Sequence, residues 1–180
     1  MKGGADFLWK SINALMEQTF QDFEIIITKA GKMAENTNAG IKKARGKYIK
    51  ILYLDDRFAH PKALEEMVNH LEETNAEWLI SGVNTNPHPY WTEDIDKGNN
   101  KLGSPSALMF INQFEDNLLF DERMSWLLDC DLYKRMYDKL VLTILPGVHV
   151  ILETGDHQMT NILTNEEKLA EHNLINEKYA

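Results

Sequence analysis

The sequence predicts an α/β fold in which helices flank a mixed, mainly parallel sheet. Apolar runs of strand length alternate along the chain with amphipathic stretches of helical period; the runs lie at residues 23–28, 48–54 and 78–83. Turn-forming or charged residues follow these runs, as expected where buried strands end. With 180 residues, 43% hydrophobic and 26% charged, the composition is typical of one globular domain, which we expect to span residues 1–180.

Charge and cysteine content exclude several classes of protein. A net charge of -9 argues against binding to a nucleic acid polymer or an anionic membrane surface. Cys130 is the sole cysteine, so the chain has no intrachain disulfide, and its first residues do not resemble a secretion signal. The longest apolar stretch, residues 140–152, is interrupted by Pro146 and Gly147 and is too short for a transmembrane segment. We therefore expect a cytoplasmic protein.

The first third of the chain predicts a helix and two strands. Residues 6–18 have apolar residues at helical spacing, and residues 23–28 form an apolar run typical of a buried strand. The sequence Asn38-Ala39-Gly40 indicates a turn, and residues 41–46 can form two helical turns that end at a glycine. Residues 48–54 then predict a second strand, joined to the first by a right-handed crossover.

Two adjacent carboxylates follow this second strand. In open α/β sheets, ligands bind beyond the carboxyl ends of the strands. Asp55 and Asp56 are therefore placed, in a solvent-facing turn, to bind a divalent cation and a phosphate that it carries. Aspartates are also common in turns and at helix N-termini, so ordinary turn chemistry is the alternative.

The rest of the chain predicts further elements of the same kind. Residues 61–74 form the clearest helix, with Pro61 in its first turn and Asn75 at its end. Residues 78–83 predict a third strand, and a polar loop follows it. Residues 141–145 and 148–152 predict a hairpin that turns at Pro146-Gly147, and a polar helical tail begins at about residue 165.

Three segments carry a resemblance to a known family. The first contains Asn38-x-Gly40, Ala44-Arg45-Gly46, Tyr48-Ile49 and Leu54-Asp55-Asp56 followed by Pro61; the second reads EQTFQDFEIII; the third runs from Phe120 to Met136. In this order they resemble family 2 glycosyltransferases with the GT-A fold. The resemblance implies a reduced GT-A fold and a hexosyltransferase-type enzyme.

The resemblance also implies a reaction and its site residues. A sugar would pass from a nucleotide-sugar donor to a glycan or other hydroxyl acceptor with inversion. Asp56 would bind Mn²⁺ or Mg²⁺ on the donor diphosphate, with Asp55 beside it. The other residues that the resemblance places on the donor side are Asn38, Gly40, Arg45, Gly103 and Ser104. A plain turn would require the same glycine and serine, and a solvated helix face would explain the cationic residues around Arg45.

The third segment implies a catalytic base, for which the helical period helps to choose between two aspartates. Asp129 shares an apolar helix face with Leu132 and Tyr133, whereas Asp131 lies toward Lys134 and Arg135. We therefore expect Asp129 to be the base and Asp131 to form surface ion pairs worth ~0.3–0.5 kcal/mol each. An N-cap role is the alternative for Asp129.

His157 is a further metal candidate, because related enzymes often place a histidine after the last strand. A solvated loop histidine is the alternative. The sequence also departs from the family pattern, since the usual Asp-x-Asp motif is replaced by Leu54-Asp55-Asp56, and Thr28-Lys29 stand where an Asp-rich turn is usual.

The chain enters the family pattern inside its first helix, so we expect the family's N-terminal nucleoside-binding strand to be absent. Strand 24–28 should then pair directly, in parallel, with strand 48–54, because unpaired buried backbone groups cost ~1–3 kcal/mol each. A homo-oligomer or an N-terminal extension that supplies the strand is the alternative. Either arrangement predicts weak donor binding by the monomer.

Two other functions stay open at this point. One is a catalytically weak glycosyltransferase homologue that acts as a binding protein. The other is a metal-dependent nucleotidyltransferase, which also places acidic residues at the end of a strand. Release of pyrophosphate from a nucleoside triphosphate would distinguish the latter.

Overall fold

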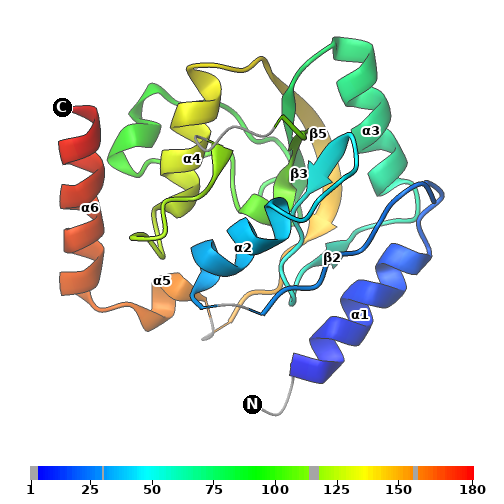
Figure 1. Cartoon of the computed structure of the whole chain (residues 1–180), viewed down its shortest axis with the longest axis horizontal. Coiled ribbons are helices and arrows are strands. Elements are labelled where there is room, and N and C mark those ends of the chain that lie inside the picture. Colours follow the sequence, from blue (N-terminus) through cyan, green and yellow to red (C-terminus); the bar gives the residue numbers. More distant parts are fainter. Residues whose placement is uncertain (1–3, 30, 114–117, 156–157) are drawn as a thin grey trace.

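The computed structural model describes residues 4–29, 31–113, 118–155 and 158–180. Within these residues, five strands form one mixed sheet in the order β1-β4-β3-β5-β2 (Figure 1). The strands are β1 (Tyr48–Lys50), β2 (Arg57–Phe58), β3 (Trp78–Val83), β4 (Leu108–Ile111) and β5 (Leu142–Ile151). The pair β3–β5 is parallel, whereas β1–β4, β3–β4 and β2–β5 are antiparallel. The sheet is thus mixed as expected, but the prediction that it is mainly parallel was wrong.

Two apolar cores lie on opposite faces of this sheet. Trp78 and Ile80 of β3 pack into the core that contains α4 (Leu128–Tyr137), while Leu79 packs into the core of α3 (Ala63–Thr74). This alternation follows from the period of two in a strand. The helices α4 and α6 (Asn165–Tyr179) therefore lie on one side, and α3 and α1 (Gly4–Met16) lie on the other (Figure 1).

The predicted strand at residues 23–28 does not form. These residues have no regular secondary structure, and β1 pairs antiparallel with β4 instead, Tyr48 facing Ile111. Ile25 and Ile27 are 46% and 66% exposed, so alternate apolar side chains do not enter a core. Side chains hold the segment in place, because the Glu24 carboxylate accepts hydrogen bonds from the backbone and side chain of Arg45. The expected parallel pairing of 24–28 with 48–54 was therefore wrong.

The helix before β1 lies earlier than predicted. It is α2 (Met33–Ile41), which ends where the expected helix of residues 41–46 was to begin. Asn38 and Gly40 lie inside α2, so the predicted turn at these residues was wrong. At the start of α2, the Glu35 carboxylate accepts a hydrogen bond from the Lys32 backbone N–H at 2.9 Å, which favours a helix that begins there.

The helix expected at 61–74 is confirmed as α3, which ends at Asn75 in a left-handed conformation with φ of 50°. The predicted hairpin at 141–152 was wrong, because these residues form the single strand β5 with an irregularity between Leu145 and Val150. Gly147 adopts a φ of 100° there, and its backbone N–H donates to the Pro87 carbonyl at 2.9 Å. Pro146 and Gly147 therefore form a bulge within one strand, although in the sequence they indicate a turn between two strands.

The helical tail is confirmed as α6, which starts at a capping box between Thr164 and Glu167. Two shorter 3₁₀ segments, η1 (Glu93–Lys97) and η2 (Pro105–Ala107), and the short helix α5 (Met159–Ile162) complete the described elements. None of the described helices is long and apolar enough to cross a membrane.

Candidate active site

Asp56 lies in the turn between β1 and β2, and it is only 5% exposed, so the expected solvent-facing position was wrong. Its Oδ1 accepts a hydrogen bond from the backbone N–H of Glu153 at 3.2 Å. Burial raises the pKa of Asp56 to about 6, and the neighbouring charge of Asp55 acts in the same direction, while the Ser106 side chain opposes the shift. The turn therefore holds a buried carboxylate whose charge is poorly compensated.

Lys50 at the end of β1 supplies a partial counter-charge that no sequence pattern had indicated. Its Nζ donates to the carbonyl oxygens of Ile51 and Ser106, and at 3.4 Å to that of Leu108. Burial lowers the pKa of Lys50 to about 7, and the charge of Asp56 partly offsets this effect. A lysine inside an otherwise apolar strand was the available signal, since a buried cation requires such partners.

Asp129 lies in the first turn of α4 and faces the loop before η2. Its Oδ2 accepts from Asn100 Nδ2 at 2.8 Å, and its Oδ1 accepts from the Cys130 backbone N–H at 2.8 Å. Burial raises the pKa of Asp129 to about 6, and these hydrogen bonds limit the shift. The carboxylate therefore has neutral partners here, and its pKa lies closer to neutral pH than that of a free aspartate.

Asn100 fixes the loop that faces Asp129, although no sequence pattern had singled it out. Its Oδ1 accepts from the backbone N–H groups of Leu102 and Gly103, and its Nδ2 donates to the Gly103 carbonyl. Gly103 has a φ of 104°, and space is open where a Cβ would stand. Tyr133, one turn after Asp129, also donates to the Gly103 carbonyl at 3.2 Å. The predicted residues Gly103 and Asp129 are thus brought together.

Tyr53 lies within the electrostatic influence of both carboxylates. Burial raises the pKa of Tyr53, the Thr37 side chain opposes this shift, and the charges of Asp129 and Asp56 add to it. In the described parts of the chain, the buried Tyr53 hydroxyl finds no hydrogen-bond partner of normal geometry. The backbone N–H of Tyr53 donates to Ser106 Oγ at 3.0 Å, which ties this residue to η2. One polar region therefore contains Asp56, Tyr53 and Asp129.

Ser104 lies beside this region in a structural role. Its Oγ accepts from the Ser106 backbone N–H and caps η2. Ser106 is fully buried and faces Asp56 and Tyr53. Ser106, and not the predicted Ser104, therefore contacts the Asp56 carboxylate.

Asn38 and Arg45 make contacts elsewhere. The Asn38 side chain, 2% exposed, exchanges hydrogen bonds with the backbone N–H and carbonyl of Phe120. Arg45 has an 85% exposed side chain and pairs with Glu24 at 3.1 Å. Gly40 lies in α2 near Thr28. The helix α2 borders the candidate site through Thr37, which lies near Tyr53. His157 lies outside the described residues.

Asp131 is not on the surface, so the expected solvent-exposed ion pairs were wrong. Its side chain has no exposed area, and it pairs with Arg135 at 2.8 Å and with Lys178 of α6 at 2.6 Å. The Tyr179 hydroxyl donates to its Oδ1 at 2.8 Å. The sequence-based argument failed because α6 covers this side of α4, and a helical period does not reveal which later element packs on a polar face.

Another contact from α6 orients the start of α4. The Glu171 carboxylate accepts hydrogen bonds at 2.8 Å from the backbone N–H groups of Ser125, Trp126 and Leu127. These donors precede α4 and would otherwise be without intrahelical partners. A negative charge at a helix N-terminus is also favourable. The position of Asp129 therefore depends on a residue more than forty positions later in the chain.

Solved structures of the Staphylococcus aureus protein TarS have a similar fold. The structure of TarS 1-349 in complex with UDP-GlcNAc has a TM-score of 0.70 and 14% sequence identity, and the match covers 96% of this chain and 62% of that one. For the complex with UDP, the TM-score is 0.61 at 15% identity, with 86% and 58% covered. A longer TarS structure has a TM-score of 0.64 at 15% identity, with 86% and 35% covered.

These similarities show that the chain shares the fold of the corresponding part of TarS. The chain spans between about a third and two thirds of the lengths of these TarS chains. No family model matches the sequence, and no curated protein sequence matches it.

Proposed function

We propose that the chain is a glycosyltransferase domain that transfers a sugar from a nucleoside diphosphate sugar to an acceptor hydroxyl, with inversion at the anomeric carbon. The observation that carries this proposal is the placement of two carboxylates: Asp56 is buried in the turn after β1, and Asp129 at the start of α4 accepts a hydrogen bond from Asn100, which also holds the Gly103 loop. The fold of TarS supports it, because structures of TarS hold UDP and UDP-GlcNAc.

The carboxylates in the β1–β2 turn fit a divalent cation. Asp56 is buried and has a second carboxylate, Asp55, close enough to raise its pKa, so the pair favours an added positive charge. Mg²⁺ and Mn²⁺ prefer such oxygen ligands. Asp56 and Asp55 would therefore hold the ion, which would neutralise negative charge on the departing diphosphate.

Asp129 would act as the general base. In the proposed reaction, the acceptor oxygen forms a bond to the anomeric carbon while the bond from that carbon to the diphosphate oxygen breaks. The acceptor hydroxyl proton passes to Asp129, and the nucleoside diphosphate carries away the electron pair. A pKa raised to about 6 suits this role near neutral pH, and such a base contributes typically ~10²–10⁴-fold.

Asn100 and Tyr133 would position the base and the substrate. Asn100 orients the Asp129 carboxylate and also holds the Gly103 loop, where open space next to Gly103 leaves room for a ligand. Tyr133 anchors the same loop from α4. The Tyr53 hydroxyl, which is buried and makes no hydrogen bond of normal geometry within the described residues, would contact the ligand.

Calorimetry with UDP and UDP-GlcNAc, with and without Mn²⁺, tests the binding half of the proposal, and release of UDP tests turnover. We expect Asp56→Asn to weaken Mn²⁺-dependent UDP binding, and Asp129→Asn to abolish turnover while UDP still binds. Asp138→Asn is a matched control, because Asp138 lies at the end of the same helix and pairs with Lys134 at the surface.

Unchanged Mn²⁺-dependent binding in Asp56→Asn would rule out the metal assignment. UDP binding by the wild-type chain without any sugar transfer would favour the binding-protein alternative. Pyrophosphate release from a nucleoside triphosphate would favour a nucleotidyltransferase.

A further inference from the structure

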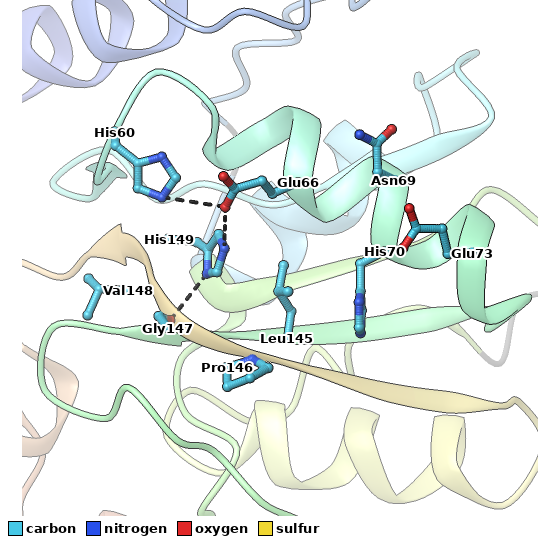
Figure 2. Close-up of a pocket in the computed structure, with 10 residues that line it drawn as sticks. All are labelled: His60, Glu66, Asn69, His70, Glu73, Leu145, Pro146, Gly147, Val148 and His149. Atoms are coloured by element: carbon cyan, nitrogen blue, oxygen red, sulfur yellow. Dashed lines mark hydrogen bonds and ion pairs between the residues drawn. The ribbon is translucent and has the colours of Figure 1, made fainter.

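A second group of chemically active side chains lies on the opposite face of the sheet from Asp129. It lines a groove of about 500 Å³ between α3 and the irregular part of β5. Figure 2 shows His60, Glu66 and His149 converging at one end of this groove. Each comes from a different segment, namely the turn before α3, the first turns of α3, and β5.

The distances among these side chains match one ion bound by three ligands. Glu66 Oε2 lies 3.0 Å from His149 Nε2 and 3.8 Å from His60 Nε2. One ligand atom from each residue falls within 4.8 Å of the others. A tetrahedral Zn²⁺ with bonds of ~2.0 Å separates its ligand atoms by ~3.3 Å, so the two measured distances bracket the required value. Glu66 and His60 have side chains exposed by 46% and 37%, which leaves them free to adjust.

The buried ring of His149 faces two oxygen acceptors. Its Nδ1 lies 3.2 Å from the Gly147 carbonyl, and its Nε2 lies 3.0 Å from Glu66 Oε2. A neutral imidazole has one N–H and can satisfy one of these acceptors. When Nδ1 donates to the Gly147 carbonyl, the lone pair of Nε2 faces the negative Glu66 carboxylate, which is repulsive. A cation bound between the two atoms would remove this repulsion.

The backbone around Gly147 is built to hold this orientation. The N–H of Gly147 is fixed by the Pro87 carbonyl at 2.9 Å, and its φ of 100° suits glycine. A Cβ on Gly82 would stand 2.1 Å from the Gly147 carbonyl oxygen, so this close approach also requires glycine. In metal sites, ligating histidines almost always donate their second ring N–H to a carbonyl or carboxylate, and the Gly147 carbonyl, 3.2 Å from Nδ1, is placed to accept such a bond from His149.

We propose that His60, Glu66 and His149 bind a divalent cation of the Zn²⁺ class, with an open coordination position facing the groove. Two imidazole nitrogens and one carboxylate suit Zn²⁺ better than Mg²⁺, which prefers oxygen ligands. The ion would join the start of α3 to β5, so it would stabilise this face of the domain. The site is separate from the carboxylates proposed to bind the donor's metal ion.

Isothermal titration calorimetry of the full chain with ZnCl₂, without nucleotide, tests the proposal. We expect one Zn²⁺ per chain, and a Tm that rises with Zn²⁺ concentration because the ion binds the folded state. His60→Ala and Glu66→Gln should each weaken binding roughly 10-fold or more, since even outer-shell changes cost roughly 10–100-fold. Both side chains are partly exposed, so folding should be retained, and circular dichroism verifies this.

Two control variants test whether Zn²⁺ binds to these three residues or elsewhere on the chain. His70→Ala removes a groove histidine that instead bonds to Thr143 Oγ1 at 2.9 Å, and it should leave Zn²⁺ affinity unchanged. Asp56→Asn should also leave it unchanged, while His60→Ala should leave Mn²⁺-dependent UDP binding intact. If no variant binds UDP while Zn²⁺ still binds to these three residues, the result would count against the proposed function and not against the Zn²⁺ site.

A wild-type chain that does not bind Zn²⁺ would overturn the proposal and leave a histidine–glutamate ion pair. Equal Zn²⁺ affinity in wild type, His60→Ala and Glu66→Gln would overturn it as well. Loss of Zn²⁺ binding in Asp56→Asn but not in Glu66→Gln would assign the ion to the β1–β2 turn instead.

Discussion

Two aspartates on opposite sides of α4 have partners of different charge. Asp129 and Asp131 are two residues apart. Asp129 is partly buried and accepts hydrogen bonds from an amide and a backbone N–H, whereas Asp131 is fully buried and pairs with Arg135 and Lys178. The first side raises a carboxylate pKa to about 6, whereas the second surrounds a carboxylate with cations. The more deeply buried of the two carboxylates is thus the one with cationic partners, so burial has to be considered together with the charges of the partners.

The largest effect on stability is expected when the ion pairs of Asp131 are removed. Asp131→Asn would leave the Arg135 and Lys178 charges facing a neutral amide inside the protein. Removing one partner of a buried ion pair typically costs ~3–5 kcal/mol, so we expect a fall of that size in the free energy of unfolding. Chemical denaturation measures it.

Asp138→Asn is the control for this variant, since its pair with Lys134 lies at the surface and should be worth less than ~1 kcal/mol. A loss in Asp131→Asn as small as that of the control would contradict the contrast between the two sides of α4.

The next largest effect on stability is expected when the contact between α6 and the start of α4 is removed. Glu171→Ala would leave three backbone N–H groups without their acceptor and should lower the free energy of unfolding by ~2–3 kcal/mol. Thermal and denaturant unfolding measure this loss. Glu177→Ala, an exposed position on the same helix, should change stability by less than ~0.5 kcal/mol. Similar losses in the two variants would indicate that Glu171 does not act as a cap.

The raised pKa of Asp129 should make stability depend on pH. Because the pKa of Asp129 is about 6 in the folded chain and about 3.8 in the unfolded chain, the folded state binds more protons between these values. Wild-type stability should therefore fall as pH rises from about 4 to about 7, by on the order of 2 kcal/mol from this group.

Asp129→Asn should remove that part of the slope, and the difference in unfolding free energy between variant and wild type, measured across this pH range, isolates it from Asp56. Parallel pH profiles for the two proteins would show that Asp129 has an ordinary pKa.

The smallest effect is expected away from α4. Arg45→Ala removes an 85% exposed side chain paired with Glu24, and such a surface pair should contribute less than ~1 kcal/mol to stability. UDP affinity measured on the same variant tests the predicted donor contact. A fall in affinity would support that contact, and an unchanged affinity would restrict Arg45 to holding residues 23–28 in place.

Sequence patterns predicted those elements whose stability depends on local signals. The helix α3 has an apolar face, a proline before its start and Asn75 at its end, and it forms nearly as predicted. Strand β3 and helix α6 were found in the same way. Asp56, Asp129 and Gly103 were chosen from the sequence, and the structure places all three around one polar region. Their catalytic roles stay predictions.

The failures involved features that depend on distant partners. Residues 23–28 have the composition of a strand, but a strand forms only when another strand offers its hydrogen bonds, and β1 pairs with β4. The Pro146-Gly147 pair marks a departure from regular structure in any fold, yet the parallel pairing of β5 with β3 makes it a bulge instead of a hairpin turn. Local propensity cannot choose between these outcomes.

The sequence by itself therefore determined the α/β class, the amphipathic helices and the acidic residues at the end of a strand, because periodicity and composition act over a few neighbouring residues. The tertiary structure alone decided the sheet order, the burial of Asp131 under α6, and the meeting of His60, Glu66 and His149. Those features join residues dozens of positions apart, and their energies depend on burial and on partner charge. Neither quantity exists until the chain has folded.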